Sequence, residues 1–393
     1  MSSTRRARYI LLGILALAAF STVGSSLATG AGQDPVAVAK ARIAPYMGIP
    51  AFNPSAWHPA AKPFDASKAK GKVIFDIPIS SSIPFIQTID QAQSQAAKVA
   101  GVTIKYFPNQ GSVSDWVKGM NEAIAQKVDL IILDAAPNPA QLQPQLMAAK
   151  KAGIPVIATH MPLGSEFPPG TLPPTNLANV TATVPGPYPL VTRLEADYAV
   201  ANTPGAKVHA LIVTSDDVAS GKGIVDMTQA EFKNLCPQTC STTVVNVPLS
   251  DWATKIQSSV QEALLRDPSI NWVIPIYDSM SQFAVPGIRA AGKTNSVRIA
   301  TFNGTPFVLK MIADHNVVAM DAGEDLSWLG WAFMDQALRI LSGAGPVPYT
   351  TSPTPVRIWD TSNIAQAGSP PAATKGYGNA YIPGFEKLWG VKG

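Results

Sequence analysis

The sequence predicts an α/β protein built from two doubly wound parallel-sheet domains. The chain has 393 residues, 46% of them hydrophobic, which exceeds the usual size of one domain and suffices for two cores. From residue 72 onward, short β-branched runs alternate with helical stretches. These runs are apolar on both faces, as expected of strands in a parallel sheet that helices cover on both sides.

The first 28 residues have the pattern of a signal peptide. Arg5, Arg6 and Arg8 precede an apolar run of roughly a dozen residues, and small residues follow up to Ala28. A membrane-spanning helix needs about 20 residues, so we expect cleavage after Ala28 and export. Arg8 stands where a twin-arginine signal has an aromatic residue, which favours a Sec-type signal. With no cysteine near the cleavage site to carry a lipid, we expect a periplasmic or secreted protein.

Charge and cysteine content exclude several classes of partner. The formal net charge is +4, but the basic residues are scattered, so no nucleic-acid partner is expected. Export favours a disulfide between Cys236 and Cys240. A metal site is the weaker alternative because no histidine stands at ligand spacing beside the pair, and a redox motif would have two intervening residues. No metal and no cofactor are expected.

Residues 29–71 are expected to form a proline-rich arm. This segment opens with the helical pattern PVAVAKARIA and continues with prolines, which deny it regular strand pairing. The first α/β unit follows it. Its strands are predicted at 72–79, 102–107, 129–134, 154–159 and 179–184, with helices at 84–100, 112–127 and 139–152.

A second α/β unit of similar size follows. Its strands are predicted at 207–214, 242–247, 270–277, 297–302 and 317–322, with helices at 188–202, 221–235, 250–266, 279–291 and 305–313. A helix at 325–341 and a strand at 356–360 come next. We therefore predict an N-terminal lobe of residues 72–184 plus 325–345, a C-terminal lobe of 185–324 plus 352–362, and a C-terminal extension of 363–393.

The carboxyl ends of the strands predict where a ligand binds, because strand-end loops of two doubly wound units can face each other across a cleft. The candidates are polar or aromatic residues at or just after these strand ends, together with two aromatic residues near helix starts. They are Ser81, Ser82, Phe85, Asn109, Asp134, His160, Asp217, Tyr277, Asp278, Asn303, Glu324 and Trp328.

No catalytic residue is expected among them. The serines lack a Gly-x-Ser-x-Gly motif and an assignable base, so hydrogen bonding and helix capping are the favoured roles. Asp134 and Asp278 each close an apolar strand and either cap a helix or accept hydrogen bonds from ligand hydroxyls. Glycoside hydrolysis by this pair is a third hypothesis, but nothing around either residue suggests a raised pKa. Phe85 and Trp328 are either core residues or cleft walls, and His160 is either structural or a ligand contact.

Over roughly residues 72–345 the sequence resembles type I periplasmic binding proteins, the ribose-binding class of ABC-transporter solute receptors. The most specific match is QKVDLIILD at 126–134 together with AKKAGIPVI at 149–157. Ser82-Ile83-Pro84-Phe85 stands where the family often has Asn-Asn-Pro-Phe. Tyr277-Asp278 occupies the position where the family has Asn-Asp. The sequence Thr-Phe-Asn-Gly at residues 301–304 corresponds to the family's Gly-Phe-Asp-Gly.

The resemblance implies two lobes joined by a multi-strand hinge, near residues 184–185, 322–323 and 345–355. In this family a sugar lies between aromatic rings, so Phe85 would stack while Asp134, Asp278 and Asn303 would bind hydroxyls. Glu324 stands near the position at the return hinge where the family has a glutamine. The implied protein is a monomer without cofactor that delivers a small solute to an ABC permease.

Departures from the family pattern bear on the solute. His160 and Met161 stand where sugar-binding members have Asp-Arg, and Ile224 stands where an arginine is expected. Two guanidinium groups that would bind ring hydroxyls are thus missing. We expect an importer receptor for a sugar or polyol, with a less polar solute as the alternative. A sensory or chemotaxis receptor is a further alternative that the sequence does not separate from import.

Overall fold

The computed structural model describes residues 34–50, 61–135, 137–162, 177–349 and 352–391. The expected signal peptide and residues 51–60 of the proline-rich arm lie outside these ranges. In the described part of the chain, every helix is too short or too polar to cross a membrane.

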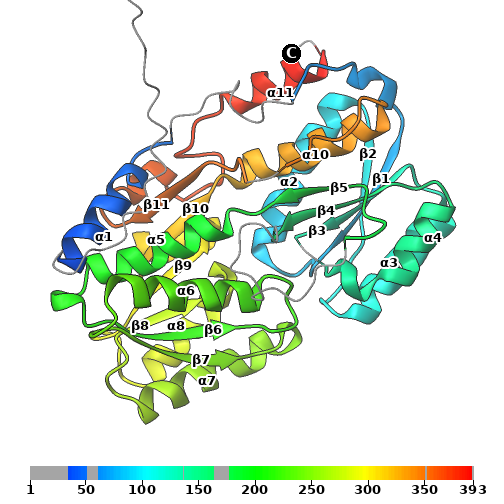
Figure 1. The fold of residues 1–393 in the computed structure, drawn as a ribbon. Coiled ribbons are helices and arrows are strands. Elements are labelled where there is room, and N and C mark those ends of the chain that lie inside the picture. Colours follow the sequence, from blue (N-terminus) through cyan, green and yellow to red (C-terminus); the bar gives the residue numbers. More distant parts are fainter. Residues whose placement is uncertain (1–33, 51–60, 136, 163–176, 350–351, 392–393) are drawn as a thin grey trace, which may run out of the picture.

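Sheet A is the first of two sheets and is parallel throughout, in the order β2-β1-β3-β4-β5 (Figure 1). Its strands are β1 (Val73–Pro78), β2 (Thr103–Tyr106), β3 (Leu130–Asp134), β4 (Val156–Met161) and β5 (Ala182–Pro185). The helices between them are α2 (Pro84–Ala100), α3 (Val113–Gln126) and α4 (Gln143–Lys151). We call sheet A with its helices the N-terminal lobe.

Sheet B has the order β11-β10-β9-β8-β6-β7, and only β11 runs antiparallel to its neighbour. Its strands are β6 (His209–Thr214), β7 (Ser241–Asn246), β8 (Trp272–Pro275), β9 (Arg298–Asn303), β10 (Val318–Glu324) and β11 (Val356–Asp360). Its helices are α5 (Tyr188–Ala201), α6 (Gly221–Leu235), α7 (Trp252–Arg266), α8 (Ser281–Ala290) and α9 (Pro306–Ala313). Sheet B with these helices is the C-terminal lobe.

The chain passes between the lobes at three places. It crosses from β5 to α5, returns from β10 to α10 (Leu326–Leu341), and crosses again from α10 to β11. Helix α10 packs on α2, so it belongs to the N-terminal lobe although it follows most of sheet B in sequence. The predicted fold class is thereby confirmed: two doubly wound sheets are joined by a multi-strand hinge. The residue bounds of the lobes stay predictions.

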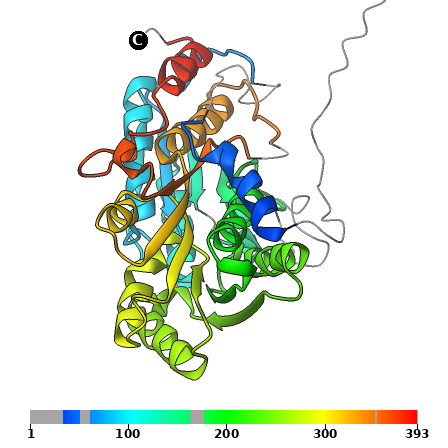
Figure 2. The ribbon, with the colours of Figure 1, turned by 90° about the vertical axis from the view of Figure 1, so that its left-hand side faces the viewer.

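Two terminal segments cover the lobes. Helix α1 (Pro35–Ile43) packs on α5, as Figures 1 and 2 show, and Arg42 forms ion pairs with Asp197 and Glu231 at 3.5 and 2.5 Å. Helix α11 (Tyr381–Trp389) packs on α10 and was not predicted. A helix of nine residues is unstable alone and forms here because it buries its aromatic side chains on α10. In the C-terminal lobe, Cys236 and Cys240 form a disulfide with a Cα–Cα distance of 5.4 Å.

We expect Trp389→Ala to destabilise the fold. Its ring is fully buried, stacks on Trp331 at 5.2 Å between centroids, and donates a hydrogen bond from Nε1 to Asp335 at 2.8 Å. Removing such a side chain lowers the free energy of unfolding by about 3–5 kcal/mol. Urea denaturation measures the loss, with exposed Lys387→Ala on the same helix as the control. Equal stability of the two variants would contradict the packing described here.

Candidate functional site

A small pocket lies where strand ends of the two sheets meet. Both lobes line it, through Ile79, Ile83, Phe85, Ala135, His160, Trp252, Tyr277, Ser279 and Asn303. Most of these side chains are apolar or aromatic. The cavity measures about 30 Å³, which admits water but not a sugar ring. A larger molecule can therefore enter only if the lobes move apart.

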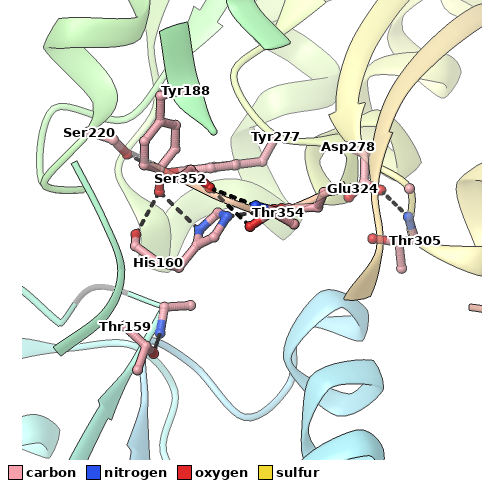
Figure 3. A network of polar contacts seen from close by, with 12 residues as sticks. Thr159, His160, Tyr188, Ser220, Tyr277, Asp278, Thr305, Glu324, Ser352 and Thr354 are labelled. Atoms are coloured by element: carbon pink, nitrogen blue, oxygen red, sulfur yellow. Dashed lines mark hydrogen bonds and ion pairs between the residues drawn. The ribbon is translucent and has the colours of Figure 1, made fainter. Parts of the chain in front are cut away.

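His160 forms the contact between the lobes at this pocket (Figure 3). It lies in β4, beside a register shift in the pairing with β5, and has a left-handed φ of 50°. Its Nε2 lies 2.9 Å from a carboxylate oxygen of Glu324, the last residue of β10. The Tyr188 hydroxyl donates to the His160 carbonyl at 2.8 Å and lies 2.9 Å from Nδ1. Because all three side chains are buried, this network joins sheet A to sheet B without intervening solvent.

Aromatic rings surround the imidazole. Its centroid lies 5.2 Å from that of Phe85, 5.1 Å from that of Tyr188 and 6.5 Å from that of Phe302. Tyr277 continues the cluster, 5.5 Å from Phe302, and its hydroxyl bonds to Ser220. The faces of these rings suit an apolar or ring-shaped ligand better than a densely hydroxylated one.

The two strand-end aspartates are buried beside the pocket and already have protein partners. Asp134 accepts a hydrogen bond from Thr159 at 2.9 Å. Asp278 accepts from the Thr305 amide at 2.7 Å, at the start of α9, and from Ser279 at 3.2 Å. Burial raises the pKa of Asp134 to about 6 and that of Asp278 to about 7, so the expectation from sequence that neither pKa is raised was wrong. Neither aspartate lines the pocket. Of the two roles expected for Asp278, helix capping and binding of ligand hydroxyls, the first is the one that it has in this conformation.

Four of the candidates line the pocket: Phe85, His160, Tyr277 and Asn303. The other candidates support loops or the core. Ser81 and Asn109 bond to each other, with the Asn109 amide donating to Ser81 Oγ at 3.0 Å and Ser81 Oγ donating to the Asn109 carbonyl at 2.9 Å.

Three further candidates have partners outside the pocket lining. Ser82 bonds to Ser80 at 3.0 Å, and Asp217 accepts from the Leu249 amide at 3.0 Å. Trp328 lies in the core, with its ring 6.0 Å from Phe385 of α11.

Sequence reasoning passed over five lining residues: Ile79, Ile83, Ala135, Trp252 and Ser279. Ser279 directly follows the candidate Asp278. Trp252 opens α7 soon after β7, so a search of strand ends that included every aromatic residue would have found it. Ile79, Ile83 and Ala135 carry no sequence signal that separates them from core residues. Met161 and Ile224, which depart from the family pattern, are fully buried and do not line the pocket.

Comparison with known proteins gives a family and a set of similar folds. Residues 74–345 match the family model described as periplasmic binding protein domain, which is more than half of the chain. No curated protein sequence matches the chain.

The solved structures that resemble the chain are about equally distant from it. A 5-methylthioribose transporter solute-binding protein from Thermotoga lettingae TMO, in complex with 5-methylthioribose, has a TM-score of 0.66 at 18% identity, covering 83% of this chain and 99% of that one. A carbohydrate transporter from Acidothermus cellulolyticus 11B, in complex with myo-inositol, has a TM-score of 0.62 at 20% identity, covering 76% and 97%. A Mycobacterium smegmatis protein in complex with β-D-fucofuranose has a TM-score of 0.63 at 18% identity, covering 76% and 94%. At sequence identities of 18–20%, the similarity to these structures shows that the fold is shared.

We expect Glu324→Ala to open the lobes. The substitution leaves the imidazole of His160 buried without its acceptor, and an unsatisfied buried donor costs about 1–3 kcal/mol. That cost applies only while the lobes are closed, so the open conformation gains population. Small-angle scattering of the solute-free protein should then give a larger radius of gyration. Lys310→Ala, which removes an exposed ion pair in the same lobe, is the control, and a profile identical to wild type for Glu324→Ala would contradict the expectation.

We expect Asp278→Asn to flatten the pH dependence of stability. The pKa of Asp278 is raised in the folded state from 3.8 to about 7, so the folded protein holds this proton more tightly than the unfolded chain. The resulting stabilisation is complete below about pH 4 and is lost as the pH rises through about 7, a change of a few kcal/mol. Asparagine keeps the acceptor but cannot ionise. Urea denaturation across this pH range measures the slope, with exposed Asp314→Asn as the control; an unchanged slope for Asp278→Asn would contradict the assignment.

Proposed function

The chain belongs to the periplasmic binding protein family, and on this premise we propose that it is the exported solute-binding receptor of an ABC importer. The observation that carries the proposal is the pocket formed by both lobes, with the buried His160–Glu324 contact across it. The receptor closes on a small solute and presents the closed form to a membrane permease. The family match also agrees with the expectation that the chain is not an enzyme.

The mechanism follows from the size of the cavity and from its position between lobes. A solute that contacts both walls stabilises the closed conformation by the difference between its affinities for the closed and open states. The three crossings between the lobes are the segments that bend. With a solute between the walls, His160 and Glu324 lie farther apart or contact the solute instead of each other.

The solute that we favour is a sugar-like or polyol-like ring with few hydroxyls and an apolar side. The similar structures whose titles name 5-methylthioribose, myo-inositol and β-D-fucofuranose support a small hydroxylated ring. The lining of this pocket supports an apolar side, because Ile79, Ile83, Phe85 and Trp252 offer no hydrogen bond partner except the Trp252 indole, which already donates to Ser215 at 2.6 Å. Asn303, Ser279 and the Tyr277 hydroxyl are the groups that would bind hydroxyls.

The remaining parts of the proposal concern where and how the receptor acts. We propose that a Sec-type signal peptide exports it, that it works in the periplasm or outside the cell as a monomer, and that no cofactor takes part. The premise for the location is the family, together with the N-terminal pattern of basic and apolar residues.

A screen by thermal shift tests the function. Sugars, deoxy and alkylthio sugars, polyols and small aromatic compounds are added one at a time, because a ligand that binds only the folded protein raises its melting temperature. The solute-free protein exchanges between open and closed conformations, so a solute that raises the melting temperature should also lower the radius of gyration in solution scattering by closing the open molecules. Binding with unchanged scattering at saturation would refute closure, and product formation from a bound glycoside would refute a purely receptor role.

We expect Phe85→Leu to weaken binding of the identified solute about tenfold, equivalent to about 1.4 kcal/mol, through loss of one aromatic wall. Titration calorimetry measures the dissociation constant. Phe107→Leu is the matched control, since Phe107 packs against Phe75 of the same lobe and does not line the pocket. Equal affinity of Phe85→Leu and wild type would remove Phe85 from the site.

A further inference from the structure

Three aspartates converge on one face of sheet A, beneath α2. Asp76 is in β1 and pairs with Ile132, while Asp134 is two residues further along β3, so both side chains point to the same face. Asp90 comes from α2. One carboxylate oxygen from each residue lies within 4.8 Å of the others. Asp76 and Asp134 are fully buried, and Asp90 is partly buried.

The oxygens of this cluster lack partners. Both oxygens of Asp76, one of Asp90 and one of Asp134 are buried and accept no hydrogen bond. Among the described residues, none of the three aspartates forms a salt bridge with a lysine, arginine or histidine. Several negative charges buried together without compensation would be strongly destabilising, so these carboxyls hold either protons or a bound cation.

Gln93 is an independent sign of a missing ligand. It lies one turn after Asp90 on α2 and is fully buried, and neither its amide oxygen nor its amide nitrogen has a hydrogen bond partner. Its side chain reaches the Asp76 carboxyl, whose pKa burial and the neighbouring carboxylates of Asp134 and Asp90 raise well above its usual value, and the contact with Gln93 offsets only part of that rise. A buried amide without any hydrogen bond is rare in folded proteins, and its oxygen is a good ligand for a hard cation.

We propose that Asp76, Asp90 and Asp134, with the amide oxygen of Gln93, bind a hard divalent cation, Ca²⁺ or Mg²⁺, inside the N-terminal lobe. The donors are all oxygens, which suits these ions and does not suit metals that prefer nitrogen or sulfur. Two oxygens on opposite sides of a calcium ion are separated by about 4.6–5.2 Å, given Ca–O distances of 2.3–2.6 Å, so the cluster is compact enough to surround one ion. The cation offsets the repulsion among the carboxylates.

The site is distinct from the pocket but adjacent to it. Asp134 directly precedes Ala135, and Thr159, which donates to Asp134, directly precedes His160. Both of these following residues line the pocket. The bound cation therefore fixes the ends of β3 and β4, which carry the N-terminal wall of the pocket.

Direct binding to the full mature chain is the test. The protein is freed of metal with a chelator, and CaCl₂ and MgCl₂ are titrated separately by calorimetry, with the melting temperature recorded alongside. We expect uptake of one ion per chain and a higher melting temperature, and the salt with the tighter binding identifies the ion. If the chain takes up neither ion at millimolar concentration, the proposal is overturned. This test uses the wild-type chain, so it does not depend on whether the variants fold.

A pair of variants locates the site. We expect Asp90→Asn to weaken cation binding about tenfold or more, because it removes a charged ligand. Asp129→Asn is the matched control: it removes a partly exposed carboxylate of the same lobe, paired with Lys72, and should bind the ion as wild type does. Wild-type binding by Asp90→Asn would overturn the proposal. The stability of Asp90→Asn and of wild type is also compared, both at saturating cation. Greater stability of Asp90→Asn would overturn the proposal, because a cation ligand should stabilise the fold more than a neutral amide does.

Discussion

The buried contact between His160 and Glu324 is the interaction on which the closed conformation depends in the absence of a solute. It joins the end of β4 in one sheet to the end of β10 in the other, and the Tyr188 hydroxyl holds the histidine from the start of α5. Two of these residues lie within a few positions of crossings between the lobes: Tyr188 follows β5, and Glu324 ends β10. A small change in the hinge is therefore enough to form or break the contact, which is what a protein that opens and closes requires.

Buried carboxylates in this protein serve the scaffold rather than the pocket surface. Asp278 holds the amide of Thr305, Asp321 accepts from the Gly304 amide at 2.9 Å, and Asp325 caps α10 by accepting from the Trp328 amide at 3.0 Å. Each fixes the backbone where a strand or loop leads into a helix, because backbone amides at a helix start lack partners within the helix. The surface of the pocket is therefore formed mainly by apolar and aromatic side chains.

The fold was predictable from sequence because its signals are repeated many times. Most strands from β1 to β10 are short apolar runs, whereas β2 and β7 are more polar and half exposed. With so many repeated signals, an error in one boundary does not change the topology. The site was predicted less completely, since it depends on side-chain direction. The strand-end rule found His160, Tyr277 and Asn303. The choice of aromatic residues near helix starts found Phe85 but also selected Trp328, which α11 covers. Helix α11 itself carried no periodic signal long enough to predict a helix.

The acidic cluster of the N-terminal lobe differs physically from the buried carboxylates Asp278, Asp321 and Asp325. Asp278, Asp321 and Asp325 each have a backbone amide that offsets the cost of burial, whereas Asp76 has no hydrogen bond to either oxygen. An isolated buried acid can remain neutral, whereas here three acids have oxygens within 4.8 Å of one another and a buried amide lies beside Asp76. These are the groups that we propose as ligands of one cation. Helix α2 supplies two of these groups and also carries Phe85 at its first turn, so a cation held beneath α2 would also constrain the aromatic wall of the pocket.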